Sequence, residues 1–195
     1  MGLETLTGPA AEPLTLAEAK AHLRVDHDDE DAVITALIAA ARARVEAYGG
    51  LRLITQTVRL TLDAFPVGGR PIWLPVWPVQ SVDSVGYTES DGTAATLAPA
   101  RWQLVRSGKP ARLAPAYLEV WPIARLWYDS VTVEMTAGFG DAAADLPADL
   151  VSAVKLVLGT LYEHREDVLA GATVGALPLT AETLIGPHVF HPGPG

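Results

Sequence analysis

The hydrophobic period of the chain changes twice, and this change constrains the fold more than any other feature. Apolar residues recur every three or four positions over residues 31–50, alternate with polar residues over 57–64 and 130–137, and return to helical spacing after residue 146. A period of 3.6 is typical of an amphipathic helix, and a period of two is typical of a half-buried strand. The sequence therefore predicts an α+β protein in which helical segments flank a β segment.

Helix start and stop signals divide the helical parts into three helices. Thr15-Leu16-Ala17-Glu18 is a capping box, which predicts the start of a short first helix. A second helix follows the acidic stretch 26–31 and ends at Gly49-Gly50, and a third runs from Pro147 to about Arg165. The expected apolar faces are Ile34, Leu37, Ile38, Ala41, Val45 and Tyr48 in the second helix, and Leu150, Val154, Val157, Leu158 and Leu161 in the third.

The β segment is expected to form a small antiparallel module. Shorter strands are predicted between the two alternating ones, near residues 71–76, 79–88, 101–106 and 117–121, and Asp91-Gly92 predicts a hairpin turn. All five tryptophans fall inside this module. Such rings fill a β core or lie at subunit interfaces, where aromatic residues are enriched. We expect both roles, and the predicted interface residues are Trp73, Trp77 and Trp127.

These patterns predict four parts. Residues 1–13 are expected to be a flexible lead-in, 51–145 an antiparallel β insertion, and 167–195 an extended C-terminal tail whose apolar pieces are separated by Gly and Pro. Residues 14–50 and 146–166 are expected to form a small helical bundle.

Composition limits the chemistry of the chain. It has no cysteine, which excludes disulfides, thiolate metal ligands and a cysteine nucleophile. Its formal net charge is −9 and it has no basic run, which argues against tight DNA binding through phosphates. The longest apolar stretch, near residues 33–41, is shorter than the roughly 20 residues that a bilayer requires, so no membrane partner is expected.

Two groups of potential metal ligands have simpler interpretations. The acidic stretch 26–31 lacks the central glycine and distal glutamate of an EF-hand, and acids are favourable at a helix start. Of the histidines His164, His188 and His191, the last two lie in a Pro- and Gly-rich segment that fixes no geometry, and we expect them to be exposed. No metal site is predicted.

Catalytic motifs are also missing from the sequence. Residues 162–166 combine acid, base and cation, but adjacent helical residues point in different directions and do not converge. Gly138-Phe139-Gly140 lacks the lysine of a phosphate loop and predicts a turn. We expect no catalytic residue and no cofactor.

Five stretches, in this order, resemble the head–tail connector (adaptor) proteins of tailed phages, prophages and gene transfer agents. They are Leu14 to Val25 running into Asp28-Asp29-Glu30-Asp31; Ile54-Thr55-Gln56-Thr57 with Leu62 to Pro66; Pro78 to Val82 leading to Tyr87 and Asp91-Gly92; Thr136 to Asp141; and Leu146 to Leu150 with Tyr162 to Glu166.

The resemblance implies a structural subunit and not an enzyme. Connector proteins form a ring of about a dozen copies beneath the portal. The ring joins head to tail and continues the DNA channel toward the stopper and tail proteins, and DNA passes without sequence-specific binding. The expected location is the head–tail junction of a virion or phage-like particle that is assembled in the bacterial cytoplasm. We expect the tail to dock on the portal through Leu177, Leu179, Leu184, Ile185 and Phe190.

Two other classes of function remain open from the residues alone. A carbohydrate- or ligand-binding β module would use the clustered tryptophans, and a bound ligand would protect them. A small hydrolase would have a convergent pocket that contains His164 and a carboxylate.

Overall fold

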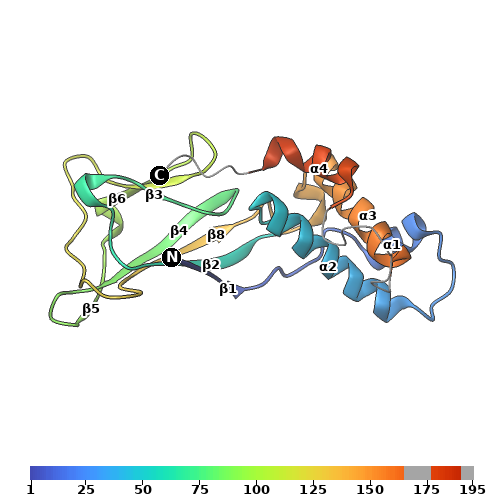
Figure 1. Ribbon diagram of the computed structural model, residues 1–195, viewed down its shortest axis with the longest axis horizontal. Coiled ribbons are helices and arrows are strands. Elements are labelled where there is room, and N and C mark those ends of the chain that lie inside the picture. The colour runs from blue at the N-terminus through green and yellow to red at the C-terminus, as the bar shows by residue number, and fades with distance from the viewer. Residues whose placement is uncertain (165–176, 190–195) are drawn as a thin grey trace, which may run out of the picture. The chain divides into compact units, whose positions relative to one another are not determined.

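The computed structural model describes residues 1–164 and 177–189, and these form two compact units. A β unit comprises Met1–Pro9 and Thr55–Gly138, and a helical unit comprises Ala10–Ile54 and the described part of Phe139–Val189. Helices and antiparallel sheets are therefore segregated along the chain, which confirms the predicted α+β class (Figure 1).

The larger sheet of the β unit has five antiparallel strands in the order β1-β2-β8-β4-β5 (Figure 1). Side chains alternate between buried and half-buried along β8, and Leu60 pairs with Val133 between β2 and β8. This alternation is the signal from which both strands were predicted. The strands are β1 (Gly2–Thr7), β2 (Gln56–Leu62), β4 (Val79–Thr88), β5 (Ala94–Thr96) and β8 (Val131–Ala137).

A second sheet of three strands completes the β unit, in the order β3-β7-β6. Its strands are β3 (Ile72–Trp73), β6 (Trp102–Val105) and β7 (Arg112–Pro115). The two sheets contribute to one hydrophobic core, in which Leu113 of the smaller sheet and Met135 of the larger sheet are fully buried. Phe65 and Trp121 stack in this core with ring centroids 5.0 Å apart.

Four helices form the helical unit: α1 (Leu16–Leu23), α2 (Asp31–Gly49), α3 (Ala148–Glu163) and α4 (Leu179–Ile185). The predicted capping box is confirmed, because the Glu18 amide donates to Thr15 Oγ1 at 3.2 Å and the Thr15 amide donates to Glu18 Oε2 at 2.9 Å. Lys20 Nζ donates to Asp28 at 2.6 Å and to Asp31 at 2.7 Å, so the acidic stretch ties α1 to the start of α2.

Both predicted turns are confirmed. Gly92 has a φ of 96°, and the Glu89 amide donates to the Thr93 carbonyl at 2.8 Å to close the β4–β5 hairpin. Gly138 has a φ of 144°, and its amide donates to the Pro78 carbonyl at 2.9 Å. Both glycines adopt backbone angles that other residues rarely adopt.

The prediction of a flexible lead-in is wrong for Gly2–Thr7, which is the edge strand β1. All six of its side chains are exposed, so no burial pattern in the sequence could indicate a strand. The backbone pairing with β2, in which Leu3 lies opposite Leu60, explains the order of this segment.

The prediction of a strand at 117–121 is also wrong. The strand of this region is β7, Arg112–Pro115, and residues 117–121 form no strand. Of these five residues only Trp121 is buried. The apolar composition of residues 117–121 therefore predicted burial, but within a single copy of the chain only Trp121 is buried.

The predicted extended tail from residue 167 differs from the structure over the residues described there. Leu179–Ile185 is the helix α4, which packs against α3, and its Ala181 and Ile185 are both fully buried. The alternative of a solvated extended chain would leave these apolar groups in water. In α2, Leu37 is only half-buried and Tyr48 is exposed, so the buried face is narrower than predicted.

Burial in α3 leads to a test of the helical core. Leu158 is fully buried, so Leu158→Ala is expected to lower the free energy of unfolding by about 2–5 kcal/mol through lost packing and a cavity. Leu37→Ala should cost less, and Leu179→Ala, at a side chain that is 80% exposed, should cost little. Urea denaturation measures all three. Equal losses at Leu158 and Leu179 would contradict the packing described here.

Candidate interaction surface

Acidic and histidine side chains do not form a metal-binding cluster in the parts of the chain that the structure describes. Residues 1–164 and 177–189 contain no cluster of three or more His, Asp or Glu side chains that could hold a metal ion. His164 is exposed at the end of α3, where its Nδ1 lies 3.2 Å from the Thr160 carbonyl. No helix in these ranges is long and apolar enough to cross a membrane.

His188 is not the exposed histidine that the sequence predicted. Its Nε2 lies 2.7 Å from Asp149 Oδ2, its ring meets Phe139 edge to face with centroids 6.1 Å apart, and only 17% of the side chain is accessible. This contact joins the turn after α4 to the first turn of α3, and therefore helps to hold α4 in place. His191 lies outside the described residues.

The three tryptophans that were predicted to form a subunit interface differ in exposure and in the cation that lies beside each ring. Trp73 is exposed on β3 beneath Arg112, Trp127 is exposed in a loop beside Arg125, and Trp77 is half-buried against the core with Lys109 over its ring. Each ring thus has a cation 5.4–5.9 Å from its centroid. Their place in an interface remains a prediction.

Trp127 belongs to a segment that carries many other exposed apolar side chains. We name the segment Tyr117–Tyr128 the apolar loop, because seven of its side chains are large, hydrophobic and 64–89% exposed. Monomeric proteins rarely expose so many such groups together. The seven are Tyr117, Leu118, Val120, Ile123, Leu126, Trp127 and Tyr128.

The apolar loop is fixed to the β unit by buried side chains and by backbone hydrogen bonds. Trp121 is buried against Phe65, and its Nε1 donates to the Arg70 carbonyl at 2.9 Å. Ala124 is also buried, and the Arg125 amide donates to the Thr88 carbonyl of β4 at 2.8 Å. The backbone of the apolar loop is therefore held in a defined position on the β unit.

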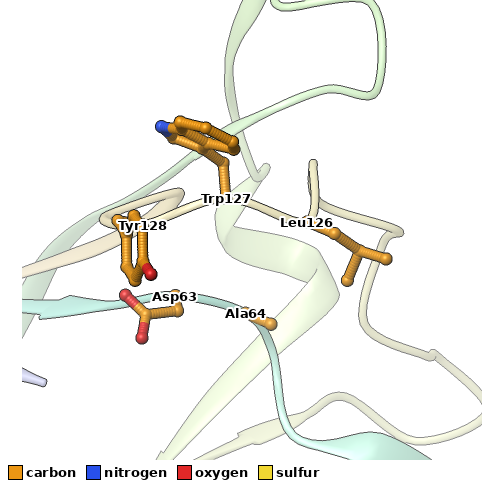
Figure 2. Close-up of a pocket in the computed structure, with 5 residues that line it drawn as sticks. All are labelled: Asp63, Ala64, Leu126, Trp127 and Tyr128. Carbon is orange, nitrogen blue, oxygen red and sulfur yellow. The ribbon is translucent and has the colours of Figure 1, made fainter.

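A shallow hollow of about 390 Å³ lies at the end of the apolar loop, lined by Asp63, Ala64, Leu126, Trp127 and Tyr128 (Figure 2). Figure 2 shows Tyr128 turned toward Asp63, whereas Trp127 points away from the backbone of Asp63 and Ala64, which follows β2. Asp63 accepts a hydrogen bond from the Asp129 amide at 3.1 Å, and it is the hollow's one acidic group. The hollow suits an apolar contact better than catalysis.

Sequence reasoning identified Trp127 but missed the other residues of this loop. It assigned residues 117–121 to a strand because they are apolar. A signal was nevertheless present: apolar residues in Tyr117–Tyr128 follow no period of two, and Pro122 interrupts them.

The residues predicted to bind the portal differ in how far their side chains are buried. Leu177 and Ile185 are buried within the helical unit, which contradicts their expected availability to a partner. Leu184 is half-buried, Leu179 is exposed, and Phe190 lies outside the described residues. Leu179 is therefore the one fully accessible member among the four that the structure describes.

The Asp149–His188 contact gives a prediction for pH. Burial raises the pKa of Asp149, but the hydrogen bond and charge of His188 outweigh burial and hold the pKa below its ordinary value. The ionised carboxylate therefore stabilises the fold above its ordinary pKa, and this stabilisation is lost as the pH falls through the lowered value.

Asp149→Asn should reduce the free energy of unfolding near pH 6, and the difference from the unmodified chain should shrink in strong acid. Asp141→Asn, at an exposed site, is the control. A difference that stays constant from pH 6 to strong acid would contradict this, and urea titrations measure it.

Comparison with known proteins places this geometry among neck proteins of phage-like particles. Residues 13–88 match the family model of the phage gp6-like head-tail connector protein. A chain in the virion of a native gene transfer agent particle is 30% identical with a TM-score of 0.81, and the match covers 100% of this chain and 98% of that one. A chain in the neck of an empty particle, computed with C6 symmetry, is 30% identical with a TM-score of 0.82 and the same coverage.

A third match, in the neck of a native particle computed with C12 symmetry, is 29% identical with a TM-score of 0.79, again over 100% of this chain and 98% of that chain. Comparison with curated protein sequences gave no match.

Proposed function

The chain belongs to the head–tail connector family of tailed phages and phage-like particles, and on that basis we propose that it joins the portal to the stopper and tail proteins. It is a connector subunit of the particle neck and works as one copy in a ring. The similarity that carries this conclusion spans both units, because the match covers the whole of this chain at 30% identity.

Symmetry supports a ring of twelve copies. A neck that contains a similar chain was computed with C12 symmetry, and C6, the symmetry used for the empty particle, is a subgroup of C12. In such a ring the copies surround a central passage. We propose that DNA moves through this passage without sequence-specific contacts, since the chain is acidic and a net charge of −9 does not favour tight binding to phosphates.

A structural role and not an enzymatic one fits the family and the described side chains. The hydrolase alternative requires His164 to share a pocket with a carboxylate, whereas His164 is exposed at a helix end. The ligand-binding alternative requires accessible tryptophans, whereas Trp77 is half-buried against the core and each of the three rings already has a cation beside it.

Imaging of assembled particles tests the proposed position. Cryo-electron microscopy of particles that contain this chain should show it at the head–tail junction, between portal and tail, in a ring with twelvefold symmetry. Density for the chain in the capsid shell or along the tail would contradict the proposal.

The portal contact can be tested at the accessible face of α4. Leu179 is 80% exposed, so Leu179→Asp should leave the fold intact and reduce the number of heads that acquire tails, because a charge would be placed in an apolar contact. Val33→Asp is the matched control, since Val33 is an exposed apolar residue of α2 in the same unit and an acid is tolerated near a helix start. Normal tail attachment in the Leu179 variant would place the portal contact elsewhere.

A further inference from the structure

We propose that the apolar loop Tyr117–Tyr128 is the surface through which each copy binds its neighbour in the ring. This inference rests on the proposed function, and it assigns the contact between copies to the β unit. The expected occupant of the surface is a second copy of this chain.

The exposure of the loop is the first argument. Leu118, Ile123 and Leu126 are each at least 86% exposed, although Leu and Ile are among the residues most often buried. Aromatic residues are enriched at the centre of interfaces, and the loop adds Tyr117, Trp127 and Tyr128. A surface of this composition fits a partner that stays bound.

The second argument is that the loop would lose little conformational entropy on binding. Association is weakened when a surface must become ordered on binding. Here the Phe65–Trp121 stack and the hydrogen bond from Trp121 to Arg70 hold the middle of the loop, and the bond from Arg125 to Thr88 holds its second half. The exposed side chains are therefore carried on a backbone that is already positioned.

A ring requires each copy to contact a second copy, and charge favours the β unit as the place of that contact. The described residues of the β unit, 1–9 and 55–138, have seven Lys and Arg against eight Asp and Glu, a net charge of −1. The described residues of the helical unit, 10–54, 139–164 and 177–189, have six Lys and Arg against thirteen Asp and Glu, a net charge of −7. Like charge opposes contact between the helical units of neighbouring copies, so the nearly neutral β unit is better suited to hold the copies together.

The loop itself adds almost no charge to that contact. Its one acid and one base are Glu119 and Arg125. Glu119 accepts from Arg101 Nε at 2.8 Å, and the Arg125 guanidinium lies 5.9 Å from the centroid of the Trp127 ring. Both charges thus have partners within the β unit, which lowers the cost of covering them.

A ring of identical copies uses heterologous contacts, in which the loop of one copy meets a different surface of the next. The same residue then does not lie opposite itself, so a disulfide between identical positions would not form. A photoactivatable group on a single thiol avoids this limit. The natural chain has no cysteine, so one introduced cysteine is its only thiol.

The experiment uses assembled particles that carry Leu118→Cys or Leu126→Cys labelled with benzophenone maleimide. Illumination should give a product of two copies of the 20.6 kDa chain from both variants. Val33→Cys, on α2 of the helical unit, should give little of that product and is the control. A covalent product with a different protein from the loop positions, or a two-copy product from Val33 alone, would overturn the inference.

A substitution gives an independent measurement. Leu126→Asp should reduce the number of copies in the neck by about tenfold or more, while near-ultraviolet circular dichroism and the melting temperature show that the β unit still folds. Val33→Asp should retain the normal number. If the folded Leu126 variant keeps a complete ring, the loop is not the contact, although the connector function stands. If the unmodified chain is absent from the neck, the proposed function itself is wrong.

Discussion

The pairing of β2 with β8 is the contact on which the β unit depends. The two strands run antiparallel from Gln56 opposite Ala137 to Leu62 opposite Val131, and they join segments about 75 residues apart in sequence. The chain enters the β unit at Thr55 and leaves it at Gly138, so this pairing closes the insertion at its base. The Gln80 side chain donates to Thr55 Oγ1 and to the Gly138 carbonyl, both at 2.9 Å, and ties entry and exit together. Closing so long a loop costs entropy, which the buried faces of both strands offset.

The remaining strands pair on both sides of β2 and β8 and thereby form the two edges of the sheet. β1 covers the free side of β2, and β4 covers the free side of β8. Arg59 of β2 reaches Glu134 of β8 at 2.6 Å, which fixes the register on the face opposite the core. The outer strands then differ in length, since β5 has only three residues while β1 has six. A short edge limits unwanted pairing with other chains.

The sequence was sufficient to predict those helices and strands in which buried residues recur at a regular spacing. β2, β8, α2 and α3 each bury one face within the chain, and their spacing reported this directly. Periodicity reports that a face is buried but not what covers it. It could not reveal β1, whose side chains are all exposed, nor the contacts of Lys20 with Asp28 and Asp31 or of His188 with Asp149. The short helix α4 was missed for a related reason, since seven residues between Pro178 and Gly186 are too few to establish a helical period.

The wrong prediction at residues 117–121 is informative because its physical premise was sound. Apolar residues in this number indicate a surface removed from water. The structure shows that the chain alone buries Trp121 and leaves Tyr117, Leu118 and Val120 exposed. For a protein that works as one copy in a ring, part of the hydrophobic pattern must encode contacts between copies, since those contacts also remove apolar surface from water. A segment whose composition predicts a core strand but whose structure is an exposed loop is therefore where an interface should be sought, and residues 117–121, at the start of the apolar loop, meet both conditions.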